Sequence, residues 1–277
     1  MDILHHLVRV PGLQALWTRF PVGSLATRMR FDIAERPAYA YGVYSAAMMA
    51  KRLGLGAISV MEFGVAGGRG LLALQRLAAE VERALSVRIA VYGFDSGSGM
   101  PPPVDYRDLP HVWGEGFYKM DVDALRTQLG RAHLLLGDLR ETVPRVMTAP
   151  ETPPLGFAAF DLDYYSSTKT AFQVFEHGVQ SRLPRAYCYF DDITGPEIAC
   201  MNEHVGELLA IREFNAGHPR LQLAKLAYLW TEREKRAIWN EKIYVFHDFD
   251  HPLYTQNVMP DGAAYRQLPL VGEPRGG

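Results

Sequence analysis

The chain contains little cysteine, no long apolar run and no block of basic residues. Cys188 and Cys200 are the only cysteines in 277 residues, too few for a disulfide framework and without CxxC spacing, which favours a reducing compartment and a cytoplasmic protein. No apolar run is long enough to span a bilayer. With a formal net charge of −2 and no concentrated positive charge, neither nucleic acid nor a membrane surface is an expected partner. We expect a small molecule as the partner of this protein.

The first 23 residues, MDILHHLVRVPGLQALWTRFPVG, lack the uninterrupted apolar core of a signal peptide. We expect a helical arm or lid over residues 1–50 that packs on the domain or on a partner subunit, which would allow a homo-oligomer; the alternative is a targeting or membrane-surface helix. The length and the 48% hydrophobic content favour one large α/β domain, placed at residues 51–270. Residues 271–277 are expected to form a flexible tail.

Short apolar runs that end in acidic or glycine residues alternate with segments of helix length. The runs are ISVMEFG (58–64), RIAVYGFD (88–95), AHLLLGD (132–138), LGFAAFDLD (155–163) and AYCYFDD (186–192). This alternation predicts a doubly wound, mostly parallel sheet covered by helices on both faces. Segments 221–230 and 242–249 predict an antiparallel pair at the sheet edge. Ligands bind at the carboxyl ends of such strands, where these acids fall: Glu62, Asp95, Asp138, Asp161, Asp163, Asp191 and Asp192.

A glycine-rich turn, MEFGVAGGRG (61–70), lies between the first strand and a helix. Glycines there let a ligand approach the backbone and the free N–H groups of the helix. The turn is not a dinucleotide fingerprint, because the second glycine of GxGxxG would fall on Ala66, and it has no GKS or GKT of a phosphate loop. Asp95, at the end of the next strand, is placed to accept hydrogen bonds from both hydroxyls of a ribose.

Five stretches, MEFGVAGGRG, VYGFDSGSGMP, LLLGDLRETVP, FAAFDLDYYSST and CYFDDI, together resemble class I S-adenosylmethionine-dependent methyltransferases, most closely the macrocin O-methyltransferase-like family of natural-product sugar O-methyltransferases. The resemblance implies a seven-stranded Rossmann-like sheet and S-adenosylmethionine as cofactor. The glycine turn would hold its methionine part, Asp95 its ribose, and Asp138 would lie near the adenine. The implied cofactor residues are Glu62, Phe63, Gly64, Val65, Gly67, Gly68, Asp95, Ser96, Gly137 and Asp138. The family motif DGDLYEST reads DLDYYSST here, without the glutamate.

The aspartates after the fourth and fifth strands form a candidate metal site. Asp161, Asp191 and Asp192 offer three oxygen ligands, a hard set suited to Mg²⁺, and the corresponding aspartates of the resembled family bind such a metal in the manner of catechol O-methyltransferase. Asp163 would then act as general base, and the two-residue strand period would point Asp161 and Asp163 to the same crevice if the strand continued that far. The alternative is that Asp163 and Asp192 cap helices, with Ser166 or Ser167 as another cap.

Residues 96–121 form a long Pro- and Gly-rich connection, a candidate substrate lid. Its Trp113, Phe117 and Tyr118 would contact the acceptor or, alternatively, anchor the loop to the domain.

The favoured function is transfer of a methyl group from S-adenosylmethionine to a hydroxyl of a small molecule, a sugar or natural product, with Mg²⁺ orienting the acceptor. One alternative is a nucleotide-sugar glycosyltransferase that binds a divalent ion through the DLD pair. Another is a catalytically silent binding module of the same fold.

Overall fold

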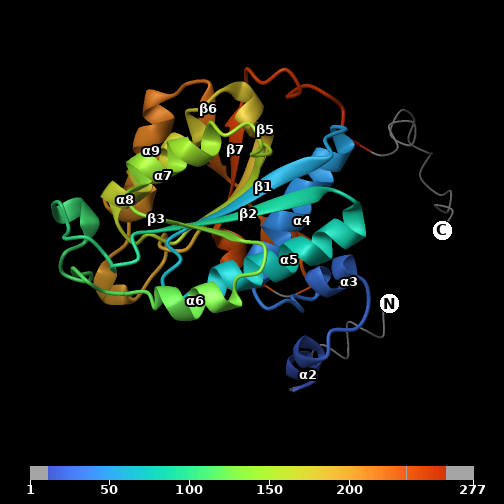
Figure 1. The fold of residues 1–277 in the computed structure, drawn as a ribbon, viewed down its shortest axis with the longest axis horizontal. Helices are drawn as coiled ribbons and strands as arrows, with labels where there is room; N and C mark the ends of the chain where they lie inside the picture. Colours follow the sequence, from blue (N-terminus) through green and yellow to red (C-terminus); the bar gives the residue numbers. More distant parts are fainter. Residues whose placement is uncertain (1–11, 235, 260–277) are drawn as a thin grey trace, which may run out of the picture.

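A seven-stranded sheet lies between two layers of helices (Figure 1). The computed structural model describes residues 12–234 and 236–259, so the start of the predicted arm and the predicted tail lie outside the described residues. The strands are β1 Ala57–Phe63, β2 Arg88–Asp95, β3 His133–Leu136, β4 Leu155–Phe160, β5 Arg182–Phe190, β6 Leu221–Lys225 and β7 Ile243–Asp248. The helices are α2 Leu13–Arg19, α3 Leu25–Arg30, α4 Pro37–Arg52, α5 Arg69–Leu85, α6 Val122–Gln128, α7 Leu139–Met147, α8 Tyr165–Ala171 and α9 Gly206–Gly217.

The strand order is β3-β2-β1-β4-β5-β7-β6, and the first five of these strands are parallel. The predicted antiparallel pair is present: β7 runs against both β5 and β6, so β7 lies second from the edge and β6 forms the edge. β1 and β4 are almost wholly buried, in agreement with their continuous apolar sequences. Within the described part of the chain, no helix has the length and apolarity needed to cross a membrane.

Two apolar layers cover the two faces of the sheet. α4 and α5 pack on one face, and α7, α8 and α9 on the other. Helix α4 crosses the predicted domain boundary at residue 50, and eight of its side chains or glycines are buried. It belongs to the sheet domain by packing, because small residues such as Gly42 and Ala46 let it lie directly on β4.

Four phenylalanines cross the sheet side by side at the carboxyl ends of β2, β1, β4 and β5. Phe94, Phe63, Phe160 and Phe190 are paired in register on neighbouring strands. Their rings are stacked with centroids 4.9, 5.0 and 4.8 Å apart, and all four are fully buried. Because each ring fills the space beside the next, these four strands end at a common level, and the residue that follows each ring emerges at the same edge.

The packing of α4 on β4 generates a stability prediction. A Cβ at Gly42 would lie 2.2 Å from Cε2 of the buried Phe157 ring. Gly42→Ala should therefore lower the free energy of unfolding by about 1–3 kcal/mol through overpacking, although alanine is favoured over glycine in a helix by about 1 kcal/mol. Urea unfolding measures the change.

Gly217→Ala in α9 is the matched control, because nothing lies within 4 Å of the added Cβ. It should leave stability unchanged or raise it. Equal effects of the two substitutions would mean that α4 does not lie as close to the sheet as described.

Candidate active site

An open cavity of about 1150 Å³ lies at the carboxyl ends of β1, β2, β4 and β5. The glycine turn after β1 and the loops after β2 and β3 form one part of its wall. The aspartates after β4 and β5, with part of the segment between β2 and α6, form another. The stacked phenylalanines directly precede several of these residues in the chain, which explains why groups from four strands reach one space.

The glycine turn is folded around the Asp95 carboxylate. Oδ2 of Asp95 accepts hydrogen bonds from the N–H groups of Val65 (2.9 Å) and Ala66 (2.8 Å), and Oδ1 accepts one from Gly97 N–H (2.7 Å). Gly64 has φ +87°, and a Cβ there would lie 1.8 Å from the carbonyl oxygen of Asp161. Only glycine fits that position, since both the backbone conformation and the close approach exclude a side chain.

Glu62 is a buried carboxylate beneath the glycine turn, with 1% of its surface exposed. Its Oε1 accepts a hydrogen bond of 2.6 Å from the hydroxyl of Tyr39 in α4, whereas Oε2 has no partner among the described residues. Burial raises the pKa of Glu62 to about 8, with the charges of Asp161 and Asp95 adding to the effect and Tyr39 and Arg36 opposing it. A buried acceptor without a donor is suited to an amine or hydroxyl of a bound ligand.

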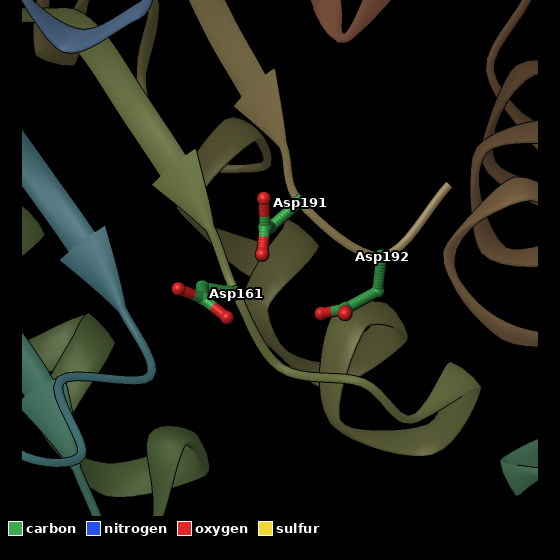
Figure 2. A group of neighbouring side chains, drawn as sticks. All are labelled: Asp161, Asp191 and Asp192. Carbon is green, nitrogen blue, oxygen red and sulfur yellow. The ribbon is translucent and has the colours of Figure 1, made fainter. Parts of the chain in front are cut away.

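Three aspartates converge at the ends of β4 and β5, as Figure 2 shows. Asp161, Asp191 and Asp192 each offer a carboxylate oxygen, and these oxygens lie within 4.8 Å of one another. Three carboxylate oxygens at this spacing fit a small divalent cation, because oxygens on opposite sides of Mg²⁺ are about 4 Å apart. The structure thus brings together the three aspartates that the sequence predicted as metal ligands, and metal binding by them stays a prediction.

The three carboxylates have different surroundings. Asp191 accepts hydrogen bonds from the Tyr189 hydroxyl (2.5 Å) and from Nζ of Lys242 (3.0 Å); burial would raise its pKa, but these two donors hold the pKa of Asp191 below its ordinary value. Asp192 accepts a 2.8 Å hydrogen bond from the N–H of Asp163. Its own N–H donates to Glu207, a fully buried carboxyl at the start of α9.

The close approach of these partly buried acids shifts their pKa values. Burial, followed by the charges of Asp192 and Asp191, raises the pKa of Asp161 to about 7. Burial and the charge of Asp161 raise the pKa of Asp163 to about 7 as well, and the pKa of Asp192 is raised well above its ordinary value by burial and by Asp163. Since like charges at short range disfavour ionisation, a bound divalent cation would let all of these groups ionise.

Asp163 reaches the cavity by a route that the strand period did not predict. β4 ends at Phe160, so the two-residue alternation of a strand does not extend to Asp163, and that argument was wrong. Asp163 has φ +58°, in the left-handed region that non-glycine residues rarely adopt, and only 8% of its surface is exposed. Strained backbone of this kind is often found at functional sites.

The alternative role of these residues as helix caps is not supported. The N-cap of α8 is Tyr164, which makes no side-chain capping bond in the described chain, so neither Asp163 nor Ser166 caps it. Asp192 binds the N–H of Asp163 instead of capping the segment that follows it. Asp138 does cap a helix, since its Oδ1 accepts the N–H of Arg140 in α7, and it also pairs with the Arg140 side chain.

Solved structures with similar folds include two methyltransferases. CalS11, a calicheamicin methyltransferase, aligns over 90% of this chain and 98% of its own, with 21% identity and a TM-score of 0.50. The O-methyltransferase NovP aligns over 76% of this chain and 79% of its own, with 16% identity and a TM-score of 0.50. The chain has a methyltransferase fold. No model of a protein family and no curated protein sequence matches it.

Within this methyltransferase fold, most of the predicted site residues line the cavity. They are Glu62, Gly64, Val65, Gly67, Asp95, Ser96, Gly137, Asp138, Asp161, Asp163, Asp191, Asp192, Trp113 and Tyr118. Three predicted residues are not among the lining residues. Phe63 points into the core and stacks between Phe94 and Phe160. Gly68 is the N-cap of α5 and faces Leu125, and Phe117 is half exposed.

Sequence reasoning missed four residues that act on the site from elsewhere in the fold. Tyr39 and Arg36 come from α4 and the residue before it, and Arg36 lies over the Tyr39 ring at 5.0 Å from its centroid. Lys242 precedes β7, and Glu207 lies in α9. None of these residues belongs to a local pattern that marks a site.

The raised pKa of Glu62 generates a prediction on stability without ligand. The pKa of Glu62 in the folded state, about 8, lies above its ordinary value of 4.5. Between these two pH values the folded state therefore binds more protons than the unfolded state. The free energy of unfolding that Glu62 contributes below pH 4.5 is lost as the pH rises toward 8. Each unit of difference is worth about 1.4 kcal/mol. Glu62→Gln stays neutral and should lose less free energy of unfolding between pH 5 and 8.

Denaturant unfolding at several pH values measures this difference. Glu151→Gln, at an exposed position, should follow the wild-type profile. Parallel profiles for wild type and Glu62→Gln would contradict the proposed protonation of Glu62.

The acidic cluster generates a prediction on metal binding. Because Asp161 has a pKa of about 7 without metal, protons compete with the ion at pH 6. Mg²⁺ affinity should be about tenfold higher at pH 8 than at pH 6, and Mg²⁺ should raise the melting temperature by mass action. Titration calorimetry gives the affinity.

Asp161→Asn should abolish most of the Mg²⁺-induced rise in melting temperature. The exposed Asp123→Asn in α6 should leave it intact. An identical rise in all three proteins would place the metal elsewhere.

Proposed function

We propose that this protein is an S-adenosylmethionine-dependent O-methyltransferase that acts on a hydroxyl of a small molecule, a sugar or natural product, with Mg²⁺ held by Asp161, Asp191 and Asp192. The observation that carries the proposal is the meeting of two different sites in one cavity. A glycine turn with two carboxyl groups beside it, the buried Glu62 and the partly buried Asp95, shares that cavity with the acidic cluster. The methyltransferase fold of CalS11 and NovP supports the proposal.

The residues of the glycine turn fit the cofactor. Asp95 keeps the turn folded through three backbone N–H groups, and a Cβ at Gly67 would meet nothing within 4 Å, so one face of the turn is open. The unpartnered Oε2 of Glu62 offers an acceptor, and Gly137 and Asp138 line the cavity after β3. When bound, S-adenosylmethionine supplies a methyl group on a sulfonium, which is already electrophilic.

The acidic side of the cavity would activate the acceptor. When bound, Mg²⁺ supplies Lewis-acid and template chemistry to an acceptor oxygen. Asp163 is the group of this chain best suited to take the proton of the acceptor hydroxyl, because it lines the cavity, is mostly buried and has a pKa of about 7. Asp161, next to it, would remain a ligand. The acceptor is thereby aligned and deprotonated in the same place.

The two alternatives account for fewer of these features. A glycosyltransferase would use Asp161 and Asp163 as an ion-binding pair but gives no role to the open glycine turn or to Asp191 and Asp192. A silent binding module gives no role to the strained, buried Asp163. Calorimetry with S-adenosylmethionine and with a nucleotide sugar, each with and without Mg²⁺, separates the three hypotheses by which ligand binds.

Turnover of two variants tests the roles of the aspartates. Methyl transfer to a vicinal diol should stop in EDTA and return with Mg²⁺. Asp163→Asn should bind Mg²⁺ and S-adenosylmethionine normally but lose about 10²–10⁴-fold in turnover, the usual contribution of a general base. Asp161→Asn should lose Mg²⁺ affinity and regain part of its turnover in excess Mg²⁺.

Asp123→Asn, exposed in α6, serves as the control. If metal rescues Asp163→Asn and not Asp161→Asn, the two roles are reversed. Full turnover after rigorous chelation would reject the metal mechanism.

A further inference from the structure

Asp108 is a fully buried carboxylate outside the acidic cluster, in the segment 96–121 between β2 and α6. Its Oδ1 accepts a 2.8 Å hydrogen bond from the N–H of Ser166 in α8. Its Oδ2 accepts 2.8 Å hydrogen bonds from the Ser166 hydroxyl and from the N–H of Val104. One carboxylate thus joins two stretches of chain that are 58 residues apart.

The bond to α8 replaces a cap that the helix does not provide for itself. Tyr164, at the N-cap, makes no side-chain capping bond, so the free N–H of Ser166 in the first turn is satisfied by Asp108 from another segment. Ser166 lines the cavity and lies three residues after Asp163. Asp108 therefore fastens segment 96–121 to the stretch of chain that carries Asp161 and Asp163.

The fastened segment forms the wall of the cavity beside the acidic cluster. Trp113 and Tyr118 both line the cavity. The N–H of Trp113 donates to the carbonyl of Leu109, directly after Asp108, and Leu109 is buried where a Cβ on Gly206 would be 3.6 Å away. The aromatic wall is thus built on a turn that Asp108 holds in place. Figure 1 shows this segment, in green, projecting beyond the sheet.

A second, partly exposed contact lies beside the buried one. The Arg107 guanidinium lies 4.4 Å from the centroid of the Tyr165 ring and is paired with Asp105. Ion pairs that water can reach contribute little, whereas a buried carboxylate with three donors leaves those donors unsatisfied if it is removed. Of the two contacts, the Asp108 hydrogen bonds therefore contribute more to the position of the cavity wall that carries Trp113 and Tyr118.

We propose that Asp108 is a positioning residue that holds the Trp113–Tyr118 wall against α8, so that the acceptor meets a preformed surface beside the aspartates. The proposal rests on the proposed function for the identity of the acceptor. It states that segment 96–121 is a fixed wall rather than a freely moving lid. Preformed surfaces bind more tightly because less conformational freedom is lost on binding.

The test compares Asp108→Asn with Asp105→Asn in the Mg²⁺-loaded protein. Both change one carboxylate of the same segment to an amide, but Asp105 is partly exposed and binds Arg107 within the segment, whereas Asp108 binds Ser166 of α8. Amide hydrogen exchange of residues 100–118 and binding of 4-nitrocatechol, a vicinal diol with a visible absorbance, are measured. In Asp108→Asn, exchange should be faster and 4-nitrocatechol binding weaker, each by about tenfold, the factor for one lost buried hydrogen bond.

S-adenosylmethionine affinity, measured by calorimetry, should be unchanged in both variants, and Asp105→Asn should match wild type in every measurement. Wild-type exchange in Asp108→Asn would overturn the proposal. So would an equal loss of cofactor and 4-nitrocatechol affinity, which would reveal general loosening. Failure of the proposed function has a separate signature: the wild type itself would not bind S-adenosylmethionine, while the exchange comparison would still decide the role of Asp108.

Discussion

The stacking of four phenylalanines across the sheet is the packing interaction on which the candidate site depends. Phe94, Phe63, Phe160 and Phe190 are in register, fully buried and stacked at 4.8–5.0 Å. Each directly precedes a site residue: Asp95, Gly64, Asp161 and Asp191. Since neighbouring rings fix the ends of the strands at one level, a shift of any strand would separate the glycine turn from the acidic cluster.

Electrostatic repulsion is the main cost of this arrangement. Four aspartates and Glu207 lie close together, and the pKa values of Asp161, Asp163, Asp192 and Glu207 are all raised, chiefly by burial. Lys242 offsets part of this cost at Asp191 through a hydrogen bond and an ion pair. Because the ionised carboxylates are destabilised when no cation is bound, binding of a cation would stabilise this site strongly. The left-handed backbone conformation of Asp163 also carries a cost, and it places a carboxyl group at the cavity, where a ligand could contact it.

Contacts between distant segments complete the site. Helix α4 supplies the hydroxyl of Tyr39 to Glu62 from beneath the glycine turn, and Asp108 fixes the aromatic wall to α8. The acceptors of both contacts, Glu62 and Asp108, are buried, so these hydrogen bonds are stronger than bonds made in water. Segment 96–121 is therefore joined to the stretch of chain that carries Asp161 and Asp163.

The alternation of apolar runs with helix-length segments determined the fold class, and the acids at the ends of those runs determined which residues share the cavity. Local pattern was sufficient there because parallel strands present their carboxyl ends at one edge. Tertiary structure alone decided the conformation of Asp163, the burial of Glu62, the inward packing of Phe63 and the partners of Asp108. Their local sequences do not specify these features: β4 stops at Phe160, α8 has no cap of its own, and the hydroxyl that binds Glu62 and the Ser166 donors that bind Asp108 lie 23 and 58 residues away from their acceptors. The local sequence pattern determines the strands and helices. The burial and the charge of a site residue depend on which distant segments pack around it.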